Sequence, residues 1–247
     1  MKKRMNLLLV FVMLFAVAGC SKAENAKPMQ SAATAEDAEP AQFVRTEESS
    51  DIEAENTSKN LIAYFSRYGN IDSTHEVDAI SSASVLVKDG EMMGNMEYVA
   101  HLVQENVGGD LYFIETAEKY SSDYDNTDNN ELDIQAEKEQ RENARPALAA
   151  HIDNMDEYGT VFLCFPNWYS DMPMAVYSFL DEYDLSGKTI VVFTSSGGGR
   201  VGSIDTIREL EPDANVADEE FTVSHSRIEA LKAEDIQDWL REIGYIK

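Results

Sequence analysis

The chain has 247 residues, and its 46 Asp and Glu outnumber its 20 Lys and Arg, which gives a net charge of −26. Such a field repels polyanions and excludes DNA and RNA as partners. Cys20 and Cys164 are too few for a disulfide framework, and the 4 histidines lack metal-ligand spacing, so we expect no metal site.

The N-terminus has the pattern of an export signal. Basic residues in Met1–Arg4 precede an apolar run, Leu7–Ala18, and a small-residue site that ends at Cys20. The run is too short to cross about 30 Å of hydrocarbon as a helix, which disfavours a permanent transmembrane anchor. The segment Val17–Cys20 resembles the lipobox of bacterial lipoproteins, and an ordinary signal peptide with a chance cysteine is the alternative. The resemblance implies lipid on Cys20 and an extracytoplasmic protein anchored to the cell membrane.

The segment after Cys20 is predicted to be a disordered acidic tether. Ala, Ser, Thr, Pro and acidic residues dominate it, so it cannot bury enough apolar surface to fold. We therefore expect a signal peptide at 1–19, the lipidated cysteine and tether at 20–58, and one folded domain at 59–247.

The remaining chain alternates short apolar runs with amphipathic segments, which predicts an α/β domain with a doubly wound, five-stranded parallel sheet. The predicted strands are Leu61–Phe65, Leu111–Glu115, Val161–Phe165, Thr189–Phe193 and a segment near Glu220–Val223. The predicted helices are Met96–Val107, Glu131–Ile152 with an interruption at Pro146, Met174–Tyr183, Ser203–Leu210 and Ala233–Ile243. In such sheets a ligand lies beyond the carboxyl ends of the strands. The segments after the first, third and fourth strands are therefore the candidate site.

The segment after the first strand suits a phosphate group. It reads Ser66-Arg67-Tyr68-Gly69-Asn70, and after an insertion at 71–93 a similar signal returns as Gly94-Asn95-Met96. The first turn of a helix offers free N–H groups, and the hydroxyl of Ser66 and the guanidinium of Arg67 can add donors. We take Gly94-Asn95 as the start of the helix and the insertion as an excursion outside the core sheet. A glycine turn that only caps the helix is the alternative.

The segment after the third strand carries two adjacent aromatic residues. Pro166 and Asn167 precede Trp168 and Tyr169 in a sequence typical of an exposed turn, where an aromatic ring commonly meets a planar ligand. Trp168 has the larger ring and is the predicted principal stacking partner. Simple packing is the alternative.

The segment after the fourth strand is rich in glycine and hydroxyl groups. It reads Ser195-Ser196-Gly197-Gly198-Gly199, and such backbone can lie flat against the edge of a ligand. A flexible turn without a ligand is the alternative.

These three segments together resemble the FMN site of the flavodoxin family. The first resembles its phosphate loop, Phe162–Leu180 closely resembles its ring-binding loop and following helix, and the third resembles the loop at the polar edge of the flavin. The resemblance covers nearly all of the chain from Leu61 onward, although Met96 or Ile71 stands where the family usually has a hydroxyl residue. It implies FMN as the cofactor. The implied binding residues are Ser66, Arg67, Tyr68, Gly69, Asn70, Gly94, Asn95, Met96, Pro166, Asn167, Trp168, Tyr169, Ser195, Ser196, Gly197, Gly198 and Gly199.

Other sites are not supported by the sequence. The run Asp123–Asp128 lacks the glycine and glutamate that a calcium-binding EF-hand loop needs. No Gly-x-Ser-x-Gly occurs, so Ser195 or Ser196 with His225 is not a hydrolase pair. Cys164 lies in an apolar run and is expected to be an inert packed residue. Tyr120 or Tyr124, after the second strand, are further candidates to line the flavin site.

Three functions follow from this reading. The first is an FMN-dependent electron carrier outside the cytoplasm, with a redox protein or a small molecule as its acceptor. The second is an FMN-dependent oxidoreductase of quinones or NAD(P)H, and the third is a non-catalytic binding module on the same fold. No Gly-x-Gly-x-x-Gly follows a strand, so no dedicated NAD(P)H site is visible, which favours the carrier. The acidic surface predicts a low redox potential.

Overall fold

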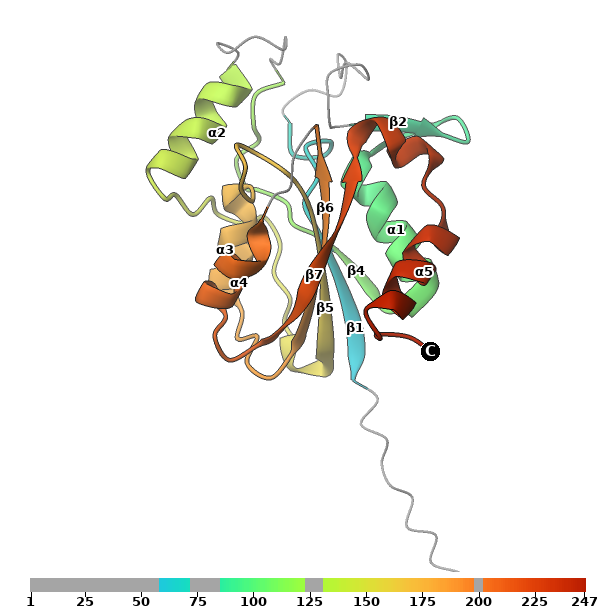
Figure 1. Ribbon diagram of the computed structural model, residues 1–247. Coiled ribbons are helices and arrows are strands. Elements are labelled where there is room, and N and C mark those ends of the chain that lie inside the picture. Colours follow the sequence, from blue (N-terminus) through green and yellow to red (C-terminus); the bar gives the residue numbers. More distant parts are fainter. Residues whose placement is uncertain (1–57, 72–84, 123–130, 198–201) are drawn as a thin grey trace, which may run out of the picture. The chain divides into compact units, whose positions relative to one another are not determined.

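A five-stranded parallel sheet forms the centre of the domain (Figure 1). The computed structural model describes residues 58–71, 85–122, 131–197 and 202–247. The strands are β1 (Lys59–Tyr64), β4 (Asp110–Phe113), β5 (Tyr158–Pro166), β6 (Thr189–Ser196) and β7 (Asn215–Ser224), in the spatial order β4-β1-β5-β6-β7. The predicted sheet is confirmed. Strand order reverses beside β1, so a ligand is expected at the carboxyl ends of β1 and β5.

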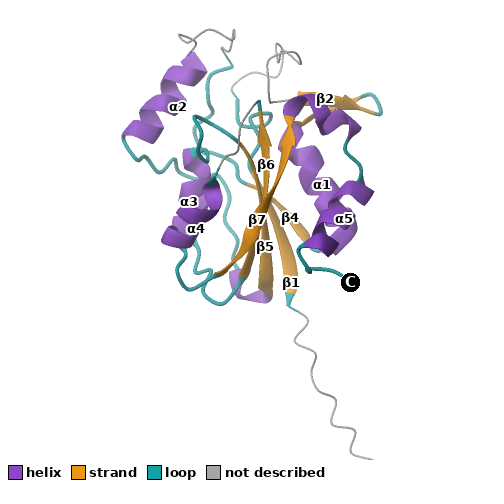
Figure 2. Cartoon of the chain, viewed as in Figure 1, coloured by secondary structure: helices purple, strands orange, loops and turns teal. Residues whose placement is uncertain are grey.

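Helices cover both faces of this sheet (Figures 1 and 2). On one face lie α1 (Asn95–Val107) and α5 (Ala233–Glu242), with the short 3-10 helix η2 (His225–Ala230) before α5. On the other lie α2 (Glu131–Arg141), α3 (Met174–Glu182) and α4 (Ser203–Leu210), and the 3-10 helix η1 (Met155–Glu157) precedes β5.

The central strand β5 shows why the sequence reads as a continuous apolar run. Val161, Leu163 and Phe165 belong to the core cluster shared with α3, whereas Phe162 and Cys164 belong to the cluster shared with α1 and α5. Both faces of the strand are therefore buried, and no polar alternation is possible. Cys164 is a free, fully buried cysteine, and burial raises the pKa of its thiol, which confirms a packed rather than reactive residue.

The insertion after β1 ends in a separate hairpin. Strands β2 (Val85–Lys88) and β3 (Glu91–Gly94) pair only with each other in the described part of the chain, which confirms an excursion outside the core sheet. Asp89 and Gly90 have φ of 52° and 86°, the backbone of a two-residue type I′ turn. Leu86 packs into the cluster on the α1 face, so the hairpin is also part of the core.

One predicted helix is much shorter than expected. The segment predicted as helical over 131–152 is helical only in α2, which ends at Arg141. Asn143 follows with φ of 50°, and Ala144 N–H donates to Glu139 O at 2.9 Å, a Schellman-type helix end. The chain then runs extended towards Leu148, which bridges Thr116. Amphipathic spacing did not reveal this stop because the stop depends on the left-handed backbone of one asparagine.

The signal, Cys20 and the tether lie outside the described residues, and their assignments remain predictions. Within the described ranges, no helix is both long and apolar enough to cross a membrane.

Candidate functional site

The loop after β1 is held by a single buried amide. Asn70 is fully buried, and its Nδ2 donates to Ser66 O at 2.9 Å and to Ile114 O at 3.0 Å. Its Oδ1 accepts the backbone N–H of Thr116 at 2.8 Å and its hydroxyl at 3.1 Å. The side chain therefore fastens the loop after β1 to the loop after β4. Its hydrogen-bonding capacity is used within the protein.

The start of α1 lies directly against this loop. A side chain on Gly94 would overlap Ser66 Oγ and come within 2.9 Å of Ser66 Cβ, so only glycine fits. Gly94 is the N-cap of α1, and its N–H donates to Glu97 Oε2 at 2.9 Å. This confirms Gly94-Asn95 as the start of the helix. The free N–H groups of the first turn thus stand beside the Ser66 hydroxyl.

Two cations lie in the same region. Arg67 is only 4% exposed, and its Nη2 donates to Ser122 O at 3.3 Å. Lys119, after β4, donates to Gly69 O at 2.8 Å and pairs with Glu115. Their positive charge lies in the loops after β1 and β4 and favours an anion at this edge of the sheet.

The N-terminus of α4, by contrast, is already occupied by a carboxylate of the chain. Glu220 is buried, accepts the Ser203 hydroxyl at 2.9 Å and accepts the Gly202 N–H at 3.3 Å. A carboxylate at a helix N-terminus accepts hydrogen bonds from donors there and interacts favourably with the positive end of the helix dipole. Because this carboxylate already lies there and repels a further anion, we call the start of α4 closed.

The loop after β5 forms a tight turn with an unusual backbone. Trp168 and Asp171 exchange two backbone hydrogen bonds of 3.0 Å, and the residues between them, Tyr169 and Ser170, have φ of 53° and 64°. Left-handed backbone at two non-glycine residues costs energy and concentrates at functional sites. The Tyr177 hydroxyl holds the turn through Asp171 at 2.9 Å.

The two aromatic residues of this turn have different environments. Trp168 is half-buried and packs edge-to-face on Phe65 and on Tyr120, both with centroids 5.2 Å away. Tyr169 is 45% exposed at the tip of the turn, and its hydroxyl donates to Asp133 O at 3.1 Å. Trp168 is thus fixed in orientation, while Tyr169 presents its ring to solvent.

A half-buried acid contacts this aromatic cluster. The Tyr120 hydroxyl donates to Glu139 Oε2 at 2.9 Å. Burial raises the pKa of Glu139 above its ordinary value, although hydrogen bonds from Gln135 and Tyr120 oppose the shift. Glu139 thus holds the hydroxyl of Tyr120, whose ring packs on Trp168.

The end of β6 adjoins the turn after β5 and carries unsatisfied polar atoms. Asn167 N–H donates to Ser195 O at 2.7 Å, and Asn167 Nδ2 approaches Ser196 Oγ at 3.4 Å. Within the described ranges, Ser195 Oγ and Asn167 Oδ1 are buried without a hydrogen-bond partner. Leaving a buried polar atom without a hydrogen bond costs free energy, and a bound ligand would supply the missing partner. No cluster of His, Cys, Asp and Glu in the described ranges could hold a metal ion.

Comparison with known proteins identifies the family. The model of a family described as Flavodoxin matches residues 84–243, well over half of the chain. The chain belongs to the flavodoxin family. None of the curated proteins matches this flavodoxin-family chain significantly.

Solved structures of similar fold are flavoproteins by name. A candidate flavoprotein from Bacteroides eggerthii DSM 20697 is 27% identical, with a TM-score of 0.56 over 77% of this chain and 99% of that one. One from Bacteroides uniformis ATCC 8492 is 22% identical, with a TM-score of 0.56 over 74% and 98%. A more distant match is a Lactobacillus acidophilus NCFM flavoprotein in complex with FMN, 16% identical with a TM-score of 0.44 over 70% and 97%.

The structure of this flavodoxin-family protein brings most of the predicted site residues to one edge of the sheet. Ser66, Arg67 and Asn95 are buried beside the start of α1, and Tyr68 lies close to Gly94. Pro166 pairs with Ser195 at the ends of β5 and β6, and Gly197 is exposed just beyond. Gly198 and Gly199, like Tyr124, lie outside the described residues.

The structure gives a different role to two residues that were predicted to contact the cofactor. The side chain of Met96 is 1% exposed in the core cluster of α1, which leaves only its backbone N–H for a ligand. The Asn70 amide is fully used inside the protein, so it positions the loop and leaves no side-chain contact for a cofactor. Lys119 was missed, and the signal available was its place just after a strand, at the carboxyl edge of the sheet.

Proposed function

We propose that this flavodoxin-family protein binds FMN at the carboxyl ends of β1, β5 and β6 and carries electrons outside the cytoplasm. The observation that carries the proposal is the fit of the start of α1 against Ser66, which brings free helix N–H groups and a hydroxyl together, with the buried Arg67 next to Ser66 in the chain. The group held there is a phosphate.

The residues present also fit the flavin ring. The turn Trp168–Asp171 holds two aromatic side chains beside β5, and the unpaired Ser195 Oγ and Asn167 Oδ1 offer polar atoms beside them. When bound, FMN supplies the redox chemistry, and the protein sets its orientation and electrostatic surroundings. Trp168, fixed by Phe65 and Tyr120, would hold the ring with little loss of side-chain freedom on binding.

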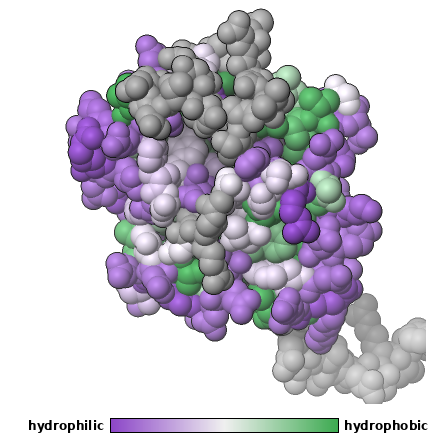
Figure 3. All heavy atoms as spheres, turned by 45° about the horizontal axis from the view of Figure 1, so that its top comes forward, coloured by the Kyte–Doolittle hydropathy of each residue, from purple (hydrophilic) through white to green (hydrophobic). Residues whose placement is uncertain are grey.

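A single phosphate-sized site favours FMN over a dinucleotide. The start of α1 joins free helix N–H groups to the Ser66 hydroxyl, whereas the buried Glu220 carboxylate faces the start of α4. Hydrophilic residues also dominate the described surface on this side of the domain (Figure 3). The net charge of −26 disfavours added negative charge on a bound flavin, so a low redox potential is part of the proposal.

The test of cofactor identity uses the full chain. Purified protein is expected to absorb visible light as a flavoprotein, and mass analysis of the released cofactor should give FMN. Adenine in the released cofactor, or no flavin after reconstitution, would overturn the assignment.

A second measurement distinguishes a carrier from a reductase. The carrier is expected to be reduced slowly by NADPH or NADH alone and quickly when a redox partner protein is added. Rapid direct reduction by either nicotinamide would favour the oxidoreductase.

The location is proposed from the lipobox alone. Cys20 is expected to carry lipid and to hold the protein at the outer face of a cytoplasmic membrane or within the envelope. Cys20→Ala should leave the protein without lipid and release it from the membrane fraction. Unchanged membrane retention by that variant would contradict the anchor.

A further inference from the structure

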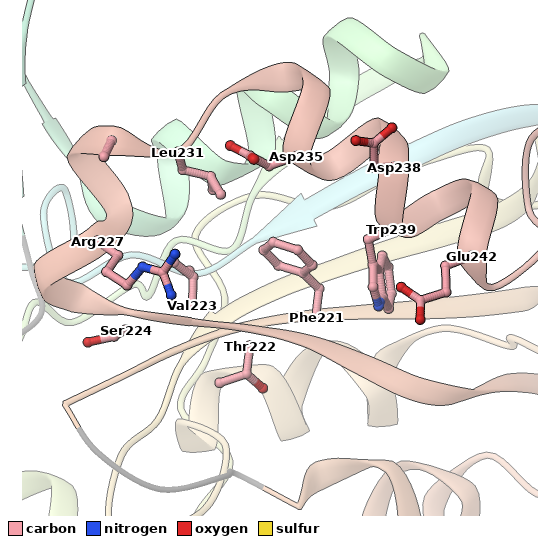
Figure 4. A pocket seen from close by; sticks show the side chains of 11 residues that line it. Phe221, Thr222, Val223, Ser224, Arg227, Leu231, Asp235, Asp238, Trp239 and Glu242 are labelled. Atoms are coloured by element: carbon pink, nitrogen blue, oxygen red, sulfur yellow. The ribbon is translucent and has the colours of Figure 1, made fainter.

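A groove of about 600 Å³ lies between the edge strand β7 and helix α5, and its Ser224 end neighbours Ser196 at the end of β6 (Figure 4). Phe221 and Trp239 point into it from opposite sides, with ring centroids 5.4 Å apart in an edge-to-face contact. Trp239 also packs on Phe193, 5.1 Å away, which fixes its ring. The groove thus has a rigid aromatic floor with half-buried rings.

The strand beside this groove has an unused edge. Within the described ranges, β7 pairs only with β6. Four consecutive residues, Phe221–Ser224, line the groove. Successive side chains of a strand point to opposite faces of the sheet, so residues from both faces border the groove. The groove therefore runs along the backbone edge of the strand. Backbone N–H and C=O groups at such an edge are a template for another strand.

Regular pairing limits where a strand can be added. The register between β6 and β7 shifts between Ile190 and Val192, and regular pairing resumes at Glu220 and continues to Ser224. The preceding residues Asp218 and Glu219 are exposed and charged, features that protect an edge from pairing with a like-charged strand. Only Glu220–Ser224 is a regular template.

The charge around the groove selects the partner. Asp235, Asp238 and Glu242 on α5 line it, and Arg227 is the one cation among the lining residues. Asp238 also pairs with Arg241 at 3.2 Å, an exposed contact that a basic segment would compete with. Glu242 also lines a second hollow of about 530 Å³ along Asn215–Glu219, which extends the acidic trough. A second copy of a chain with net charge −26 is repelled there, whereas a basic segment is attracted.

We propose that the groove between β7 and α5 binds an extended, lysine- or arginine-rich segment of another protein, which pairs with Glu220–Ser224 as an additional strand. Every second side chain of that segment faces α5. A Lys or Arg there lays its aliphatic stem on Trp239 and extends its charge to Asp238 and Glu242. Alternate basic residues are therefore the expected recognition pattern. The inference does not rest on flavin binding.

The probe is a fluorescein-labelled octapeptide with Lys at alternate positions and Thr or Val between them. Fluorescence anisotropy with the full chain measures its dissociation constant, and hydrogen exchange measures protection of backbone amides. We expect saturable binding, weaker at high salt, with slower exchange at Glu220–Ser224. Two control peptides have Glu in place of Lys, or N-methyl groups on alternate backbone amides, and neither should bind comparably.

A matched pair of variants tests the contribution of the acids. Asp238→Asn with Glu242→Gln removes two charges from the groove and should weaken the peptide at least about tenfold. The control, Asp205→Asn with Glu209→Gln, removes two exposed charges from α4 on the other face and should change affinity less than about twofold. Far-ultraviolet circular dichroism and melting temperature check that both variants are folded.

Several outcomes would overturn the proposal. Equal weakening by the two charge pairs would mean that the peptide senses only net charge. Equal binding of the N-methylated peptide, or no protection at Glu220–Ser224, would exclude strand addition. Concentration-dependent protection of Glu220–Ser224 without peptide would make a second copy of this chain the occupant.

Discussion

The N-termini of α1 and α4 are the same structural feature in two different surroundings. α4 follows β6 of the central sheet, whereas α1 follows β3 of the separate hairpin and begins against the loop after β1. At α4 a buried carboxylate, Glu220, accepts the Ser203 hydroxyl and the Gly202 N–H. At α1 the glycine N-cap is pressed against Ser66, and Arg67 and Lys119 are close to the same loop. Each helix start holds a carboxylate of the chain, Glu97 at α1 and the buried Glu220 at α4, but only α1 lies against the Ser66 hydroxyl. The side chains around a helix start, and not its place in the fold alone, therefore decide whether it suits an anion.

The largest effect is expected from the amide that holds the Ser66 loop beside α1. Asn70→Leu keeps the volume but leaves several buried backbone groups unpaired, and it should lower the free energy of unfolding by about 3–6 kcal/mol. Urea unfolding measures this. Asn215→Leu removes an exposed amide that donates to Gly187 O and should cost less than about 1 kcal/mol. If both variants lost a similar free energy of unfolding, the buried hydrogen bonds of Asn70 would contribute no more than those of an exposed amide.

One substitution should disrupt the start of α1 directly. Gly94→Ala adds a Cβ that overlaps Ser66, so the helix or the loop must move. We expect FMN to bind at least about thirtyfold more weakly, because about 2 kcal/mol or more of charge-assisted hydrogen bonding depends on this fit. Isothermal titration calorimetry measures the affinity. Gly90→Asn is the control, at a hairpin position with nothing within 4 Å: its φ of 86° strains any side chain, so stability should fall, but FMN should bind normally.

The contrast between these helices could be seen only partly in the sequence. The run into α1 predicted an anion site because Gly94-Asn95 precedes an amphipathic helix, and the start of the helix is confirmed. Glu220 is distant from Ser203 in the chain, and nothing local indicates that it closes α4. Asn70 likewise reads as a loop residue near a ligand, whereas its partners Ile114 and Thr116 come from another loop. Local periodicity predicts the sheet and helices well, but long-range polar pairs decide the details of the site.

The ring end of the site is tested by its two aromatic residues. Trp168→Ala should weaken FMN several-fold to a few hundred-fold, since aromatic pairing contributes about 0.5–1.5 kcal/mol beyond burial. Tyr169→Ala should weaken it less, because the Tyr169 ring is smaller. Quenching of FMN fluorescence measures both affinities, and the midpoint potential should shift in Trp168→Ala. A larger loss in Tyr169→Ala would make the exposed tyrosine the stacking residue.

The closed helix N-terminus predicts a variant that affects stability alone. Glu220→Gln keeps a hydrogen-bond acceptor but removes the charge that faces the α4 dipole, so stability should fall by about 1 kcal/mol. FMN affinity should stay within about twofold. Chemical unfolding and calorimetry on the same variant give the two numbers. A large loss of FMN affinity would show that α4 also serves the cofactor.

The smallest effect concerns pH. Burial raises the pKa of Glu139 above the ordinary 4.5, so the folded state holds the proton more tightly than the unfolded state. The contribution of Glu139 to stability therefore falls as pH rises from about 4.5 through its raised pKa, and is constant above it. Glu139→Gln should remove this dependence, and Glu137→Gln, exposed on the same helix, should not. Unfolding curves at several pH values decide between them.

The central claim is that the start of α1 and the Ser66 loop bind the phosphate of a flavin mononucleotide. Calorimetric titration of the apoprotein with FMN and with riboflavin, which lacks the phosphate, tests it most directly. The account predicts that FMN binds roughly a hundredfold more tightly than riboflavin, and that Gly94→Ala removes most of this difference while riboflavin affinity changes little. Equal affinity for the two flavins in the unmodified protein would contradict the account.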